Sequence, residues 1–151
     1  KGGVADVSQR TLFPFFSGGQ TPPAAAASLP LYRDVRMDYG QGIPVFDAGE
    51  PVIVSGLEAV KSWAWRAIMT ERYLWEPFSW DYGCELMALV GQPYNSDTRL
   101  SEARRYVEEA LTVSPYITGA SATVEGLAGS ELRLTARITT VYGETEVTAY
   151  V

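Results

Sequence analysis

Four carboxylates that lie among aromatic residues are the side chains in this sequence best suited to chemistry. They are Glu71, Glu76, Asp81 and Glu85, and all four tryptophans fall between residues 63 and 80. An apolar environment raises the pKa of a carboxylic acid, which lets such a group act as a general acid. A glycosidase needs two carboxyl groups that face one another across a cleft. Spacing does not establish that geometry, and carboxylates near helix ends commonly cap helices or face solvent.

The sequence lacks the residues that the common catalytic and metal-binding sites require. The sequence contains no histidine, which excludes imidazole acid–base catalysis, Ser-His-Asp and Cys-His pairs, and most zinc sites. Cys84 is the single cysteine, and without a histidine to activate it we expect a buried packing residue. Phosphate-binding loops, dinucleotide-binding glycine patterns, nucleophile elbows and calcium loops are missing from the sequence. We therefore predict a protein that is not an enzyme, with no catalytic residue, cofactor or metal ion.

Length and charge restrict the partners. A chain of 151 residues, 46% hydrophobic and 20% charged, is typical of one globular domain with its own core. The net charge of −6 disfavours nucleic acid, because an acidic protein gains nothing from counterion release on a phosphate backbone. No apolar run approaches the ~20 residues needed to span a bilayer. We expect neither nucleic acid nor a membrane as a partner.

A first helix is predicted from residue 55 to about residue 70. It opens with SGLE at residues 55–58, which has the pattern of a capping box. Its apolar stripe consists of Leu57, Val60, Ala64, Ala67 and Ile68. Trp63 and Trp65 flank this stripe on opposite sides, so other parts of the protein must cover the helix on more than one side.

Two further helices are predicted, at residues 81–90 and 98–112. Gly91 and Pro93 end the shorter one. The longer one has an apolar face, formed by Leu100, Ala103, Val107, Ala110 and Leu111. The apolar side chains in and beside the shorter helix should pack against the first helix; they are Trp80, Tyr82, Leu86 and Leu89.

The last part of the chain predicts β structure. Apolar and polar residues alternate over residues 131–140, and the apolar face continues at residues 147, 149 and 151. A two-residue loop, at 142–143 or at 143–144, keeps these apolar positions opposite one another. An earlier strand near residues 117–124 should join the sheet. One edge of this sheet should be left with unpaired amides and carbonyls that suit the addition of a partner's strand.

The first 30 residues predict an extended arm and linker that precede a single domain at residues 31–151. Phe13, Phe15 and Phe16 form an apolar anchor, and a Gly/Pro/Ala-rich stretch follows at residues 17–27. Proline and glycine there disfavour a long helix or a central strand. Two interpretations remain open: a linker that crosses the surface, or an arm that docks on a neighbouring subunit through the three phenylalanines. The predicted fold is α+β, with three helices packed on a small, mostly antiparallel sheet.

Short segments along the chain carry a resemblance to a known family. They read GLEAVK at 56–61, TER at 70–72, WDYGCEL at 80–86, LVG at 89–91, EAL at 109–111, PYI at 115–117 and TVYGE at 140–144. In this order and spacing the sequence resembles the XkdS-like phage tail proteins, over roughly residues 13–151. These are related to the baseplate wedge subunit that is often called the lysozyme-like or sheath-initiator protein.

The resemblance implies a non-catalytic structural subunit of the baseplate wedge of a contractile phage tail or tail-like particle. Such a subunit links other wedge proteins to the first tail-sheath ring. The implied partners are wedge proteins, the tail sheath protein and tube or hub proteins, in a ring with multiple copies. The implied location is the tail baseplate of the virion, after assembly in the bacterial cytoplasm.

One departure from the wider wedge family concerns the segment after the last helix. Relatives carry a Glu-Pro-Arg motif there, whereas this sequence reads SPY at residues 114–116. The ionic contacts of that motif are therefore not expected here. The residues predicted to bind partners are Phe13, Phe15, Phe16, Trp63, Trp65, Pro115, Tyr116, Thr148 and Tyr150. Two alternative functions stay open: a carboxylate-dependent cell-wall glycan hydrolase of the tail, and a free-standing peptide-binding module.

Overall fold

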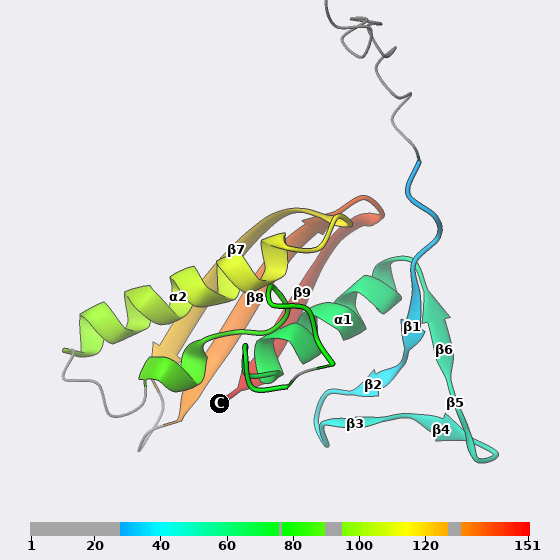
Figure 1. The fold of residues 1–151 in the computed structure, drawn as a ribbon, viewed down its shortest axis with the longest axis horizontal. Helices are drawn as coiled ribbons and strands as arrows, with labels where there is room; N and C mark the ends of the chain where they lie inside the picture. The colour runs from blue at the N-terminus through cyan, green and yellow to red at the C-terminus, as the bar shows by residue number, and fades with distance from the viewer. Residues whose placement is uncertain (1–27, 76, 90–94, 127–130) are drawn as a thin grey trace, which may run out of the picture.

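The computed structural model describes residues 28–75, 77–89, 95–126 and 131–151 (Figure 1). The elements are β1 (Arg33–Val35), β2 (Met37–Asp38), β3 (Ile43–Pro44), β4 (Phe46–Asp47), β5 (Glu50–Pro51), β6 (Ile53–Ser55), α1 (Leu57–Met69), the 3-10 helix η1 (Leu86–Leu89), α2 (Ser96–Thr112), β7 (Ile117–Gly126), β8 (Leu132–Thr140) and β9 (Gly143–Tyr150). This is the α+β arrangement with small antiparallel sheets that the sequence predicted. The phenylalanines of the predicted arm lie outside the described residues.

The largest sheet consists of β7, β8 and β9 in sequence order, all antiparallel. Both α-helices cover one face of it: α2 packs on β7, and α1 packs on β9 (Figure 1). The other face is polar and carries cross-strand ion pairs, Glu125 with Arg133 and Arg137 with Glu146. The predicted alternation is confirmed, because the apolar positions of both C-terminal strands are buried under the helices; they are Leu134, Ala136, Ile138, Val147 and Ala149.

The β8–β9 loop has the predicted length, two residues, but the predicted position was wrong. The loop is residues 141–142, and Thr140 pairs with Gly143. The Thr140 hydroxyl donates to the Gly143 carbonyl at 2.8 Å and accepts from the Tyr142 amide at 3.0 Å. Gly143 has a φ of 126°, which an L-residue rarely adopts. These contacts fix the turn one residue earlier and still keep the apolar positions of both strands opposite one another.

The predicted capping box at the start of α1 was wrong. Ser55 is the last residue of β6, and its backbone pairs with Arg33. The N-cap is Gly56, with a φ of 64° and no side-chain cap. Glu58 forms an ion pair with Arg36 at 3.3 Å. Ser55, which the capping box would have used as its N-cap, is therefore part of the β1–β6 ladder.

The prediction of three helices was also wrong, because the described residues contain two α-helices and one short 3-10 helix. Residues 81–84 form turns and a bridge, in which Cys84 pairs with Glu71. The Cys84 amide donates to the Thr70 carbonyl at 2.8 Å, and this bond to the end of α1 holds the segment out of a helical conformation. The predicted helix at 98–112 is confirmed as α2, whose N-cap, Asn95, accepts from the Thr98 amide.

Leu86 and Leu89 are buried in the core, as predicted, but η1, which carries them, packs mainly on α2 and not on α1. Tyr82 is half-buried, and its ring lies 5.8 Å from that of Trp63. Trp80 was wrongly predicted to be in the core: it is 79% exposed. Its place in a turn carries the side chain away from α1.

Residues 33–55 form a branched β structure that packs against α1. Three short ladders, β1–β6, β2–β3 and β4–β5, meet at one point. At that point the Arg36 amide donates to the Val52 carbonyl, the Val52 amide to the Val45 carbonyl, and the Val45 amide to the Arg36 carbonyl, at 2.8–2.9 Å. This closed ring of three bonds satisfies the backbone groups that the diverging ladders leave.

Candidate protein-interaction site

The outer edge of β9, called the β9 edge below, presents a row of backbone groups away from the sheet. Leu132 and Val151 exchange both backbone hydrogen bonds, at 2.7 and 3.0 Å. Because bonded and non-bonded pairs alternate in an antiparallel ladder, the observed register decides which residues face outward. The outward N–H and C=O groups belong to Glu144, Glu146, Thr148 and Tyr150. Within the described residues, these groups have no hydrogen-bond partner.

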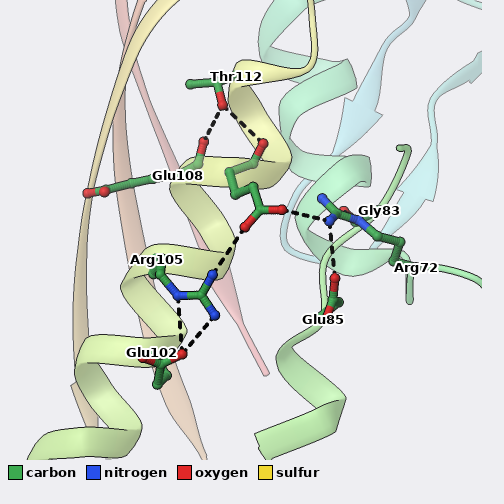
Figure 2. A network of polar contacts seen from close by, with 8 residues as sticks. Arg72, Gly83, Glu85, Glu102, Arg105, Glu108 and Thr112 are labelled. Atoms are coloured by element: carbon green, nitrogen blue, oxygen red, sulfur yellow. Dashed lines mark hydrogen bonds and ion pairs between the residues drawn. The ribbon is translucent and has the colours of Figure 1, made fainter. Parts of the chain in front are cut away.

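The opposite edge of the sheet, β7, is partly covered. By the same alternation the Ala122 amide faces outward, and it donates to the Glu108 carboxylate of α2 at 2.9 Å. Figure 2 shows the Glu108 side chain as it reaches from the helix toward the strands. A side chain of this protein therefore occupies part of the β7 edge, whereas β9 offers its row of donors and acceptors freely.

A hollow of about 550 Å³ adjoins the C-terminal end of β9. Tyr150 lines it together with the β2–β3 turn and one side of α1, including Met37, Tyr39, Trp65 and Met69. The Tyr39 hydroxyl lies 3.3 Å from the Ser62 hydroxyl and ties the turn to the helix. Burial raises the pKa of Tyr39, which therefore stays neutral in this contact. A hollow lined by both apolar and polar side chains thus lies next to the end of the β9 edge.

The loop between α1 and η1 is closed at its base by backbone contacts. The Cys84 amide bonds to the Thr70 carbonyl, and the Arg72 amide donates to the Cys84 carbonyl at 3.2 Å. Gly83 has a φ of 105°, and a Cβ there would lie 2.8 Å from the Thr70 carbonyl oxygen. The close approach of the two chain segments therefore requires glycine.

The Arg72 side chain completes this closure (Figure 2). Its Nε donates to the Gly83 carbonyl at 3.1 Å, and Nη1 donates to the carboxylates of Glu85 at 3.1 Å and Glu109 at 3.2 Å. The side chain is only 6% exposed. Burial alone lowers the pKa of Arg72, but the hydrogen bond and charge of Glu109 and the charge of Glu85 raise it overall, so the guanidinium stays charged. We call the contacts of Arg72, Gly83, Cys84, Glu85 and Glu109 the Arg72 clasp; it joins the loop to α2.

The loop above the clasp, residues 73–82, is called the aromatic loop below. Its large apolar side chains are exposed to solvent, from 49% for Phe78 to 79% for Trp80. The other exposed members are Tyr73, Leu74 and Trp75. Contiguous exposed apolar surface on a folded domain marks an interaction site. Sequence reasoning missed this surface because it assigned Trp80 to the core; the density of aromatic residues in one short segment was the available signal.

The structure places the predicted partner-binding residues in different environments. Trp65 and Tyr116 are buried, and Trp63 is half-buried against Tyr82, so packing within this chain uses most of their surface. Pro115 is exposed at the end of α2.

Two other candidates, Thr148 and Tyr150, lie together on the β9 edge. Both have outward backbone groups, and the Tyr150 side chain is exposed. The structure therefore brings these two residues together, and Tyr150 lines the same hollow as Trp65 of α1.

The groups considered for chemistry are dispersed or engaged. Glu85 belongs to the Arg72 clasp, Cys84 is buried, and Glu76 lies outside the described residues. Burial raises the pKa of Cys84 to about 11, which makes it a poor nucleophile. In the part of the chain that the structure describes, no three acidic or cysteine side chains cluster as a metal site would require. None of the described helices has the length and apolar character needed to cross a membrane.

An open edge strand and an exposed aromatic loop on an α+β fold are features common in proteins that bind other proteins. The family of contractile injection system sheath initiators has a sequence model that matches residues 33–143. The chain belongs to this family, and the predicted relationship to sheath initiators of phage tails is confirmed. Its role is structural, in sheath assembly of a contractile injection system. No curated protein gives a significant match.

Proposed function

We propose that this chain starts the sheath by accepting a β-strand of the first sheath subunit along the β9 edge. The observation that carries the proposal is the row of four residues whose backbone groups face outward without a partner in the described structure. Strand addition depends on main-chain hydrogen bonds and little on side chains. It therefore suits a subunit that must begin a polymer of a different protein.

The asymmetry between the two sheet edges supports the choice of β9. Glu108 already accepts the outward amide of Ala122 on β7, so a strand added there would have to displace a charged side chain. At β9 an added strand meets free donors and acceptors and ends near the hollow beside Trp65 and Met69. Alternate side chains of the added strand face the helix layer, where this hollow can receive them.

The proposal also includes attachment to other baseplate wedge proteins, in several copies arranged as a ring. The support is that different residues form the β9 edge and the aromatic loop, which allows contacts with two kinds of partner. The two adjoin at Val151, which shares a hollow with Trp75 and Phe78 of the loop. The place of action is then the tail baseplate of a virion or tail-like particle that is assembled in the host cytoplasm.

The test is Thr148→Pro, which removes an outward amide without removing a bond to β8. Two matched controls separate this effect from others. Thr148→Val keeps the amide and removes the hydroxyl, and Ala120→Pro removes an outward amide from the opposite edge. Baseplates that contain each variant are mixed with sheath protein and observed by electron microscopy, after circular dichroism has shown that each variant is folded.

We expect sheaths on baseplates with Thr148→Val or Ala120→Pro, and few or none with Thr148→Pro. Normal sheath assembly by folded Thr148→Pro would rule out strand addition at β9. If only Ala120→Pro prevents sheath assembly, the strand of the sheath subunit is added at the β7 edge and not at the β9 edge.

A further inference from the structure

A small pocket lies within the aromatic loop and is not part of the β9 edge. Its volume is about 170 Å³, and Glu71 lines it together with five aromatic residues: Tyr73, Trp75, Phe78, Trp80 and Tyr82. The rings of Tyr73 and Trp80 are 5.9 Å apart, and those of Phe78 and Tyr82 are 4.8 Å apart. Aromatic rings therefore form most of the wall.

The charges around this pocket favour a cation. The face of an aromatic ring is electron-rich and attracts a cation within about 6 Å of its centre. Glu71 is the acidic residue of the lining, and it forms no ion pair with any residue that the structure describes. The nearby arginines are already neutralised: Arg72 pairs with two glutamates of the clasp, and Arg66 pairs with Asp34. The uncompensated charge at the pocket is negative.

Backbone and side-chain contacts hold the base of the loop that carries this pocket. The Arg72 clasp closes the base of the loop, and Tyr73 has a φ of 68°, a conformation that costs free energy in a non-glycine residue. Tyr73 and Trp80 nevertheless remain exposed at the entrance.

We propose that this pocket binds the cationic side chain of a lysine or arginine that a neighbouring protein of the assembly presents. A chain with a net charge of −6 favours a basic partner, and the pocket supplies the local recognition. Cation binding in this pocket requires no strand pairing, so this proposal can be tested separately from strand addition at the β9 edge.

The test uses the full chain and n-butylammonium chloride, which reproduces the end of a lysine side chain. The readout is the set of tryptophan indole N–H signals in ¹⁵N NMR, assigned with single Trp→Phe variants. We expect saturable shifts of the Trp75 and Trp80 signals. At the same concentration, 1-butanol, which has the same carbon chain without the charge, should leave them in place, and so should sodium chloride.

Variants identify the groups responsible. Trp80→Leu and Glu71→Gln should each weaken binding by roughly 2- to 5-fold, the range expected of one exposed cation–π contact or one surface ion pair. Phe46→Leu and Glu131→Gln remove an exposed aromatic residue and an exposed glutamate outside the pocket and should leave the dissociation constant unchanged.

Three results would overturn the assignment. The first is the absence of saturable shifts at Trp75 and Trp80. The second is equal binding of 1-butanol, which would make the pocket merely apolar. The third is co-sedimentation with phosphatidylcholine vesicles that Trp80→Leu abolishes, because the cation would then come from a lipid.

Discussion

Gly83→Ala tests whether the Arg72 clasp holds the aromatic loop in place. The substitution adds a single methyl group to a backbone with a φ of 105°. The new Cβ would lie 2.8 Å from the Thr70 carbonyl oxygen and 3.0 Å from the Arg72 amide nitrogen. Both atoms belong to backbone that is itself hydrogen-bonded to Cys84, so they cannot move without weakening those bonds.

The expected loss follows from two contributions. A non-glycine residue in this region of φ costs about 1–3 kcal/mol. The steric conflict adds about 1–3 kcal/mol, the range of overpacking in a filled site. Alanine also lowers the conformational entropy of the unfolded chain, which stabilises the folded state by about 0.4–1 kcal/mol and offsets part of this loss. We therefore expect Gly83→Ala to lower the free energy of unfolding by about 2–5 kcal/mol.

Gly49→Ala is the matched control. Gly49 has a φ of 88°, and a Cβ there would meet nothing within 4 Å. The control carries the conformational cost and the same effect on the unfolded chain, but no steric conflict. Urea unfolding should place Gly83→Ala below the control by about 1–3 kcal/mol, or roughly 1 M in midpoint for an m-value near 2 kcal/mol/M.

The thiol of Cys84 provides a second readout, because the loop can open without global unfolding. If Gly83→Ala matches the control both in urea midpoint and in the rate of Cys84 alkylation, then the close approach of the two segments does not stabilise the loop. That result would refute the reasoning on the clasp.

Three further predictions follow from burial and from the sequence. Leu86→Ala should cost about 2–5 kcal/mol in urea unfolding because Leu86 is 5% exposed in the core; a loss well under 1 kcal/mol would contradict its place there. Iodoacetamide at pH 8 should alkylate native Cys84 at least about 100-fold more slowly than the unfolded chain, because the rise in pKa from 9.0 to about 11 lowers the thiolate fraction by that factor; equal rates would contradict it. Deletion of residues 1–20 should leave the circular dichroism spectrum and melting temperature unchanged but weaken assembly into baseplates, because the Gly/Pro/Ala-rich stretch at residues 17–27 lets the three phenylalanines reach outward to a neighbouring subunit; if the deletion unfolds the domain, the arm belongs to the core.

The sequence by itself determined the elements whose pattern repeats. The alternation along β8 and β9 specified which residues are buried, because successive side chains of a strand point to opposite faces. The apolar face of α2 followed in the same way from the helical period. Membership of the sheath-initiator family was likewise readable, because it rests on residue types in a fixed order. The outward amide of Thr148 was predictable once β9 was taken as an edge.

Only the tertiary structure decided the features that depend on contacts between distant residues. Ser55 does not cap α1 because Arg33 pairs with its backbone, and Gly83 lies in a turn because Thr70 and Arg72 bond to its neighbour Cys84. The exposure of Trp80 follows from that turn. The difference between the two sheet edges likewise depends on one contact, from Glu108 to Ala122. A local sequence pattern cannot specify such contacts, since each is made by groups that come together only after the chain has folded.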